Sequence, residues 1–285
     1  MPVDLHERLS EFSYGYGVTR EVEDELRGRG LSATPFFPNL IHEAELGFDV
    51  GFNLPGVPLL LQFKLGQAVR RFVPGPRPSL AQPFWRYTID TAEPDGQFEL
   101  LLKAEVDGAD VFYVAPKFHD WEIYLRAFER REVLDRSLVV RPSTIRQVLT
   151  SHSIPDEKHK VVYDNMRAYL CSTPMVLETV EAADVCKKVE SRVRSIETPI
   201  GETLERIYAG FSERAAIRRV REQRVSEDSD RTVYAIPSEE GEQPELRQER
   251  LNRFQGAGRS REEAIALAVG AEAWSSGAQL IFVTG

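Results

Sequence analysis

The chain has 285 residues, of which 42% are hydrophobic and 28% are charged, as in an ordinary globular protein of one large domain or two small ones. The net charge of −9 argues against a protein that coats nucleic acid non-specifically, because such binding depends on many Lys and Arg contacts with phosphate. No apolar run approaches the roughly 20 residues that cross a bilayer, and two cysteines, Cys171 and Cys186, are too few for a disulfide framework. We therefore expect a cytoplasmic protein without a membrane partner.

The N-terminal stretch, residues 5–27, has apolar residues at helical spacing and is expected to be largely helical. Gly15 and Gly17 interrupt the pattern, and Thr19 could begin a second helix as its N-cap. The sequence therefore predicts two short helices rather than one long one.

Two strand-like runs follow within residues 43–65, on either side of a Pro-Gly-Val-Pro turn. Apolar and polar residues alternate in the first run, and the second run is apolar enough for a strand buried on both sides. Pairing Leu54 with Leu59 would join the two runs as an antiparallel hairpin. We predict this hairpin as the centre of the fold.

Polar side chains would gather on one face of that hairpin. Its register sets Asp49 opposite Lys64, with Gln62 beside them, and the alternation adds Glu43 and Glu45 if the first strand extends that far. A buried lysine needs partners, because an unpaired buried charge is costly. Carboxylates with a nearby lysine suit a metal-dependent site that cleaves phosphodiesters, in which the carboxylates hold Mg²⁺ and the lysine stabilises charge on the phosphate.

This arrangement resembles the PD-(D/E)xK nuclease superfamily, whose members have the restriction-endonuclease-like fold. Asp49 matches the first acid and Lys64 the lysine, while Gln62 stands where the family usually has Asp or Glu. The resemblance implies a catalytic set of Asp49, Gln62 and Lys64, with Mg²⁺ or Mn²⁺ bound by Asp49, Gln62 and one of Glu43 or Glu45. It further implies hydrolysis of nucleic acid, DNA more often than RNA. Glu11 and Glu21 on the preceding helix are candidates for a further metal-binding acid, but surface solvation is the favoured interpretation of each.

Three other interpretations stay open. Gln62 removes one negative charge and Phe48 replaces the proline of the family motif, so the chain could be an inactive nuclease-like fold that binds nucleic acid or assembles proteins. The Asp49–Lys64 pair could be an ordinary cross-strand ion pair. An unrelated hydrolase could use Glu43 and Asp49. A Mg²⁺-dependent nuclease stays our leading prediction over these three, and fold analogy suggests a defence effector or a repair component.

Arginines and aromatic residues alternate after Lys64. This pattern suits phosphate contact and base stacking, although a solvated loop with buried aromatic side chains explains it equally well. The candidate nucleic-acid-binding residues are Arg70, Arg71, Arg77 and Arg86, and the interleaved aromatic residues are Phe72, Phe84, Trp85 and Tyr87.

Helices and strands alternate from residue 97 onward. We predict helices at residues 97–106, 121–128 and 145–149, and strands at 110–116, 137–140 and 160–163. For residues 97–106 a strand is the alternative. With the preceding helix and hairpin, this order is compatible with an αβββαβ core. The expected fold class is therefore α/β, with a central mixed sheet, flanking helices and a helical C-terminal extension.

The sequence divides into four expected regions. They are a nuclease-like α/β core (1–170), a helical hairpin (171–224), a polar flexible connector (225–262) and a helix–strand unit (263–285). The final unit, with an amphipathic helix from Arg261 to Trp274, must dock on the core sheet or on a partner. A protein partner or a homodimer through the C-terminal half is therefore expected alongside nucleic acid.

Overall fold

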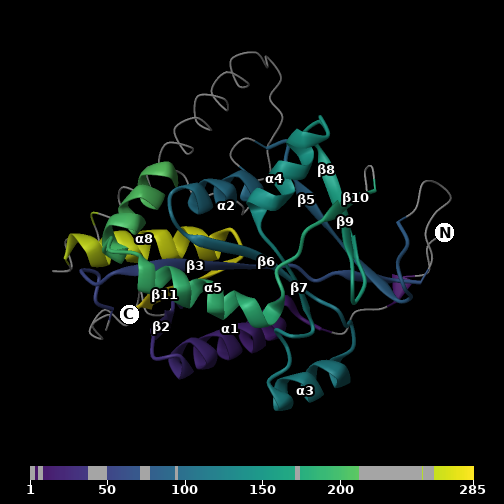
Figure 1. Ribbon diagram of the computed structural model, residues 1–285, viewed down its shortest axis with the longest axis horizontal. Helices are drawn as coiled ribbons and strands as arrows, with labels where there is room; N and C mark the ends of the chain where they lie inside the picture. Colours follow the sequence, from purple (N-terminus) through teal and green to yellow (C-terminus); the bar gives the residue numbers. More distant parts are fainter. Residues whose placement is uncertain are drawn as a thin grey trace, which may run out of the picture.

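The computed structural model describes residues 4–5, 9–37, 50–70, 78–93, 96–170, 174–211, 252 and 260–285. Two β-sheets lie among helices, and one of the sheets is mixed, so the predicted α/β class with a mixed sheet is confirmed (Figure 1). Within the described residues, no helix combines the length and apolar character that a membrane span needs.

The central sheet has five strands in the order β2-β11-β3-β6-β7. Their bounds are β2 Ser32–Pro35, β11 Ala278–Thr284, β3 Gly56–Phe63, β6 Asp110–Pro116 and β7 Ser137–Val140. β3 and β6 are parallel, and the other neighbouring strands are antiparallel. Helix α2, Gln97–Val106, lies between the parallel strands in sequence, as a crossover connection requires.

β3 is enclosed on every side. All eight of its residues are buried, as the sequence predicted, because its two faces carry apolar side chains almost throughout. β11 pairs along Gly56–Gln62 on one edge, and β6 pairs along Leu59–Phe63 on the other. The predicted hairpin is therefore wrong, because no free edge remains for residues 50–54. That segment lies against the start of a later helical stretch instead, where the Ile200 N–H donates to the Leu54 carbonyl at 2.9 Å.

Helices cover both faces of the central sheet (Figure 1). Helix α1, Glu11–Gly28, and helix α5, Ala182–Ser195, pack on the face to which Leu59 and Leu61 point. Helices α2 and α8, the latter spanning Arg261–Ser275, pack on the face to which Leu60 points. Each face of β3 thus contributes to a different hydrophobic core.

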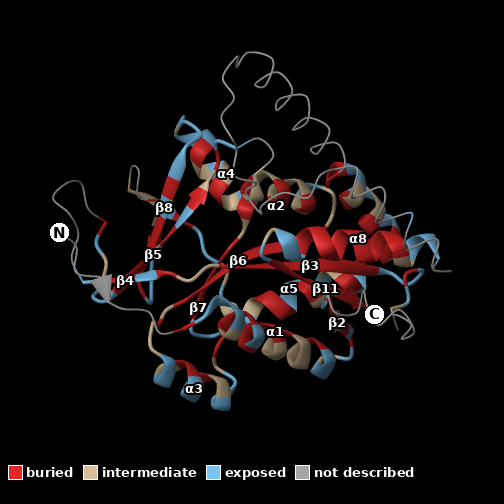
Figure 2. Ribbon diagram, turned by 180° about the vertical axis from the view of Figure 1, so that it is seen from behind, coloured by how far each residue is buried: buried red, intermediate tan, exposed pale blue. Residues whose placement is uncertain are grey.

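α8 and β11 dock on the protein's own sheet, between β2 and β3. The predicted helix and strand are confirmed, but α8 is not amphipathic. Its residues 264–273 are all buried, and Figure 2 shows the helix buried along most of its length. Because every face of the helix is buried, its sequence lacks the polar stripe that identifies a solvent-exposed face. Ser260 begins the helix with a capping box, in which its side chain and that of Glu263 bind each other's backbone N–H.

A second sheet of six strands, all paired antiparallel, packs beside the α2 side of the central sheet. Its strands in sheet order are β1 Asp4–Leu5, β4 Gln67–Val69, β5 Phe84–Asp90, β8 Lys158–Tyr163, β9 Ala168–Leu170 and β10 Met175–Leu177. Further helices in the described part of the chain are α3 Trp121–Arg130, α4 Pro142–Ser151 and a helical stretch over residues 200–211. The expected elements between residues 97 and 163 are thus confirmed in kind, although α4 extends beyond the predicted 145–149 at both ends. Most of the expected connector, 225–262, lies outside the described residues.

α1 is one continuous helix, so the predicted break at the two glycines is wrong. It begins at Glu11, after the Ser10 side chain accepts a hydrogen bond from the Ser13 N–H at 3.0 Å. The glycines serve packing instead. A Cβ on Gly15 would lie 2.6 Å from the Phe63 ring, and one on Gly17 would lie 3.1 Å from the Tyr124 hydroxyl.

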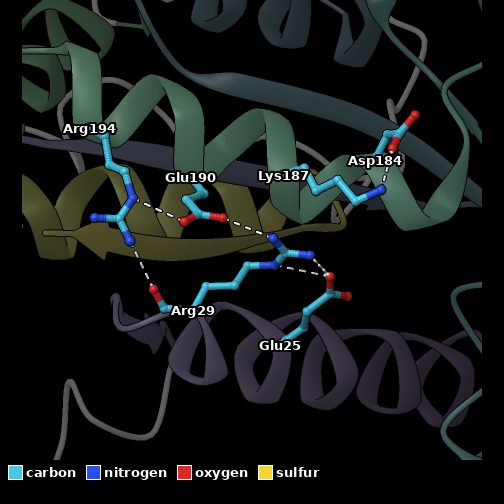
Figure 3. A network of polar contacts seen from close by, with 6 residues as sticks. All are labelled: Glu25, Arg29, Asp184, Lys187, Glu190 and Arg194. Carbon is cyan, nitrogen blue, oxygen red and sulfur yellow. Dashed lines mark hydrogen bonds and ion pairs between the residues drawn. The ribbon is translucent and has the colours of Figure 1, made fainter.

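Charged side chains tie the end of α1 to α5 (Figure 3). Arg29 donates to Glu25 within the α1 end at 2.7 Å and to Glu190 on α5 at 2.9 Å. Arg194 donates to Glu190 at 3.0 Å and to the Arg29 carbonyl at 3.0 Å. Because both helices cover the same face of β3, this network fixes their relative position at the surface.

Replacement of Gly270 by alanine should destabilise the fold, although alanine is the better helix former. A Cβ there would lie 2.5 Å from the ring of Phe36, which is buried, so neither group can move away freely. We expect a loss of about 1–3 kcal/mol in the free energy of unfolding, measured by urea denaturation. Gly28→Ala is the matched control, because nothing lies within 4 Å of its Cβ position and alanine is favoured by up to about 1 kcal/mol. Equal effects of the two substitutions would contradict this packing.

Candidate functional site

The described residues of the predicted motif, Gln62 and Lys64, lie where the parallel strands β3 and β6 end. The chain leaves the sheet at Lys64, whose backbone N–H donates to the Val114 carbonyl of β6 at 3.0 Å. The beginning of α2 and the turn from α8 to β11 reach the same edge through side-chain hydrogen bonds. In open α/β sheets, ligands bind outside the carboxyl ends of parallel strands. This edge is therefore the candidate position of a ligand-binding site.

Gln62 is the buried member of the group. Its Nε2 donates to the Phe63 carbonyl at 3.1 Å and to the Gly277 carbonyl at 3.0 Å. Two carbonyl acceptors can only be satisfied by the amide nitrogen, so they fix the orientation of the amide. Its Oε1 is buried and accepts no hydrogen bond from any described residue. An unsatisfied buried oxygen is unusual in a folded protein and points to a missing partner.

Lys64 is half-buried and is oriented by a neutral amide. Its Nζ donates to Gln97 Oε1 at 2.6 Å, and Gln97 Nε2 in turn donates to the Ser276 carbonyl. Burial lowers the pKa of the Lys64 ammonium below its ordinary value, and the negative charge of Glu11 partly opposes this. An ammonium has three N–H donors, so the bond to Gln97 leaves two available for a ligand.

Glu11 joins the group from the other side of the sheet edge. It is the first residue of α1, and its carboxylate lies near the Leu65 backbone N–H. Burial of the carboxyl raises the pKa of Glu11, while the Lys64 charge and the Leu65 N–H oppose the rise. Glu11 is exposed, as the favoured sequence interpretation predicted, and it also lies close enough to Lys64 for the two charges to shift each other's pKa.

Glu21, the other acid considered on this helix, has a structural role. Its two carboxylate oxygens accept from the backbone N–H groups of Val133 and Leu134 at 2.9 and 2.8 Å. They fasten α1 to the segment that leads into β7. Glu21 is therefore neither a site residue nor a solvated surface acid.

The other predicted metal ligands, Asp49, Glu43 and Glu45, lie outside the described residues. Within the described part of the chain, no group of three or more His, Cys, Asp and Glu side chains is placed to hold a metal ion. The candidate site residues that the structure describes are therefore Glu11, Gln62 and Lys64.

Of the predicted nucleic-acid-binding arginines, Arg70 and Arg86 are described, and Arg71 and Arg77 lie outside the described residues. Arg70 is exposed at the end of β4. Arg86 donates to Gln67 on the neighbouring strand at 3.0 and 3.1 Å. The adjacent aromatic side chains are not available for base stacking, because they are buried in the core. These buried residues are Phe84, Trp85 and Tyr87.

Sequence reasoning missed the residues that orient this group. Gln97 was predicted only as the start of a helix, and Gly277 has φ of +78°, which glycine adopts without strain. A Cβ on Gly277 would lie 3.2 Å from Gln62 Nε2. Nothing in the local sequence signals that either residue would lie next to Gln62 or Lys64, because their contacts join distant segments.

A cleft of about 190 Å³ adjoins the site. It lies between the first turns of α1 and the edge of the sheet, and Glu11 and Gly277 belong both to its lining and to the polar group. Four aromatic side chains contribute to it and remain exposed, namely Phe12, Tyr16, Phe37 and Trp274. The spacing of Phe12 and Tyr16 on one helix face is the only sequence signal for this feature.

Comparisons with protein-family models, with curated proteins and with solved structures found no match for this chain. Its function is therefore inferred from the chemistry of these residues.

Gln62→Glu should destabilise the fold, even though an acid is the usual residue of the resembled motif. The introduced carboxylate would face the Phe63 and Gly277 carbonyls, which are both acceptors, so its folded pKa should be raised. We expect a loss of about 1–3 kcal/mol at pH 7. Because the raised pKa belongs to the folded state, the loss should be small below about pH 4 and grow as pH rises.

Urea denaturation of wild type and the variant at several pH values measures this effect. Gln62→Met is the control, since it also removes both hydrogen bonds but adds no titrating group. A pH-independent loss in Gln62→Glu would contradict the placement of this side chain.

Proposed function

We propose that the chain is a divalent-metal-dependent nuclease that hydrolyses phosphodiester bonds, with DNA as the more probable substrate. The observation that supports this most directly is the state of Lys64. Its ammonium is half-buried at the carboxyl end of a parallel strand, and its hydrogen-bond partner among the described residues is a neutral amide. A desolvated cation whose partner among the described residues is neutral is suited to bind an anionic group.

Lys64 would stabilise the charge that develops on a phosphate during hydrolysis. The Gln97 amide oxygen holds the ammonium in place, so little reorganisation is needed when the phosphate arrives. Glu11 lies close enough for each charge to shift the pKa of the other. Glu11 is exposed, so its carboxylate can accept a hydrogen bond from water, and we assign it the role of orienting the attacking water.

The described residues offer one oxygen that is suited to a hard divalent cation. The Gln62 Oε1 atom is a buried oxygen without a partner among the described residues, and Mg²⁺ prefers oxygen ligands. Gln62 would hold the ion together with Asp49 and one of Glu43 or Glu45, as the sequence resemblance implies. A bound Mg²⁺ or Mn²⁺ would neutralise phosphate charge and lower the pKa of a coordinated water.

The test is cleavage of plasmid DNA, single-stranded DNA and total RNA by the purified chain with Mg²⁺ or Mn²⁺. Lys64→Ala should lower the rate about 10²–10³-fold, the effect typical of removing one group that stabilises transition-state charge. Lys103→Ala is the matched control, because this lysine pairs with Asp107 on α2, and its rate should match wild type. Asp49→Ala should also abolish cleavage.

Absence of cleavage by wild type on every substrate would overturn the proposal and favour a non-catalytic module that binds nucleic acid or assembles proteins. Equal cleavage by Lys64→Ala and wild type would refute the site assignment while leaving the reaction class intact.

The pH dependence should show the state of Lys64. Burial lowers its pKa, so the ammonium should lose its charge at a pH below the ordinary lysine value of 10.5. Activity should therefore fall on the alkaline side before pH 10.5. Lys64→Arg keeps a charge at every accessible pH, so any activity it retains should lack this alkaline fall. The measurement is the initial rate from about pH 7 to 11 for both proteins. An identical alkaline fall in both would show that another group causes it.

A further inference from the structure

Exposed aromatic side chains are concentrated in the cleft beside Lys64. Phe12 is 71% exposed and Tyr16 51%, both on α1, while Phe37 after β2 is 40% exposed and Trp274 on α8 is 37% exposed. In the part of the chain that the structure describes, only one further aromatic side chain is comparably exposed, Trp121 at 39%. Four of these five residues line one cleft, although they come from three separate segments.

Glycines in the lining leave space between these aromatic rings. Gly15 and Gly277 line the cleft without side chains, and Phe63 lies beneath Gly15. Tyr16 is held in place because its ring stacks on Phe128, with centroids 6.0 Å apart. Glu11 is the only charged residue in the described lining. The cleft is therefore an aromatic and nearly uncharged surface.

The cleft and the polar group are continuous. Glu11 lines the cleft and interacts with the charge of Lys64, and the Gly277 carbonyl accepts the hydrogen bond from Gln62. A ligand with one uncharged planar part and one anionic part could therefore occupy both places at once. A nucleotide has this combination, with a base that stacks on aromatic rings and an adjacent phosphate.

We propose that this cleft binds an unstacked base of a single-stranded nucleic acid and places the adjoining phosphate at Lys64. This inference rests on the proposed function for the role of that phosphate. Aromatic rings stack on any base, which supplies affinity independent of sequence. A base inside a duplex is already stacked and is out of reach, so the cleft selects single strands or melted ends. Stacking would also add affinity that a chain of net charge −9 does not gain from phosphate contacts alone.

The test measures binding without cleavage, in EDTA, by fluorescence anisotropy. The probes are a labelled oligothymidylate of about ten nucleotides and an abasic strand of equal length, which keeps the sugar–phosphate chain but has no bases. Wild type should bind the abasic strand at least tenfold more weakly. Tyr16→Ala and Trp274→Ala should each weaken oligothymidylate binding about tenfold and leave abasic binding unchanged.

Trp121→Ala is the matched control, because Trp121 is as exposed as Trp274 but lies outside the cleft, and it should bind like wild type. Equal binding of the two probes by wild type, or equal losses in Trp121→Ala and Trp274→Ala, would overturn the inference. A duplex of the same oligothymidylate serves as a third probe, and its binding as tightly as the single strand would also overturn the inference. The absence of binding to any probe would overturn it as well, and the cleft would then be better suited to a protein side chain.

Lys64→Ala separates this inference from the proposed function. It should bind both probes more weakly but keep the preference for the strand with bases. Cleavage by wild type without a base preference would refute the cleft and leave the nuclease proposal standing. A base preference without any cleavage would refute the nuclease proposal and leave the cleft standing.

Discussion

The complete enclosure of β3 is the constraint on which the rest of the structure depends. Helices cover its two faces, and β11 and β6 occupy its two edges, so its backbone and side chains are removed from water together. Every polar group of such a strand must find a protein partner or lie at an end. Gln62 has two carbonyl partners, and Lys64 lies at the open end of the strand. The polar site is thus a consequence of where the apolar strand stops.

The same enclosure explains the amide at position 62. β11 pairs beside β3, and the turn before β11 brings the Gly277 carbonyl to within 3.0 Å of the Gln62 nitrogen. A donor is required there, and a carboxylate cannot be one when ionised. In the resembled family this position usually carries an acid. The departure is therefore suited to the way this chain completes its sheet, and under the proposed function other acids would have to supply the negative charge for a metal ion.

Charge and aromatic surface complement each other in the proposed site. A net charge of −9 gives a weak field for attracting a polyanion, and Lys64 is a single half-buried cation. Attraction of phosphate by a desolvated cation is strong but short in range, whereas stacking on aromatic rings adds affinity without charge. Together they would favour a substrate whose bases are already accessible. This arrangement suits selective action better than general degradation.

The sequence by itself determined the elements whose pattern is local. Helix 97–106 and strand 110–116 were predicted with their observed bounds. The signals for them, helical periodicity and a continuous apolar run, are contained within the elements themselves. Only the tertiary structure decided which strand lies beside β3, since a strand from the C-terminus took the edge that the nearest upstream segment was expected to take. Gln62 and Lys64 could be proposed as site residues from the sequence, but Gln97, Gly277 and Trp274 could not be. Their roles depend on contacts between segments far apart in the chain, and such contacts follow from how whole faces and edges are buried.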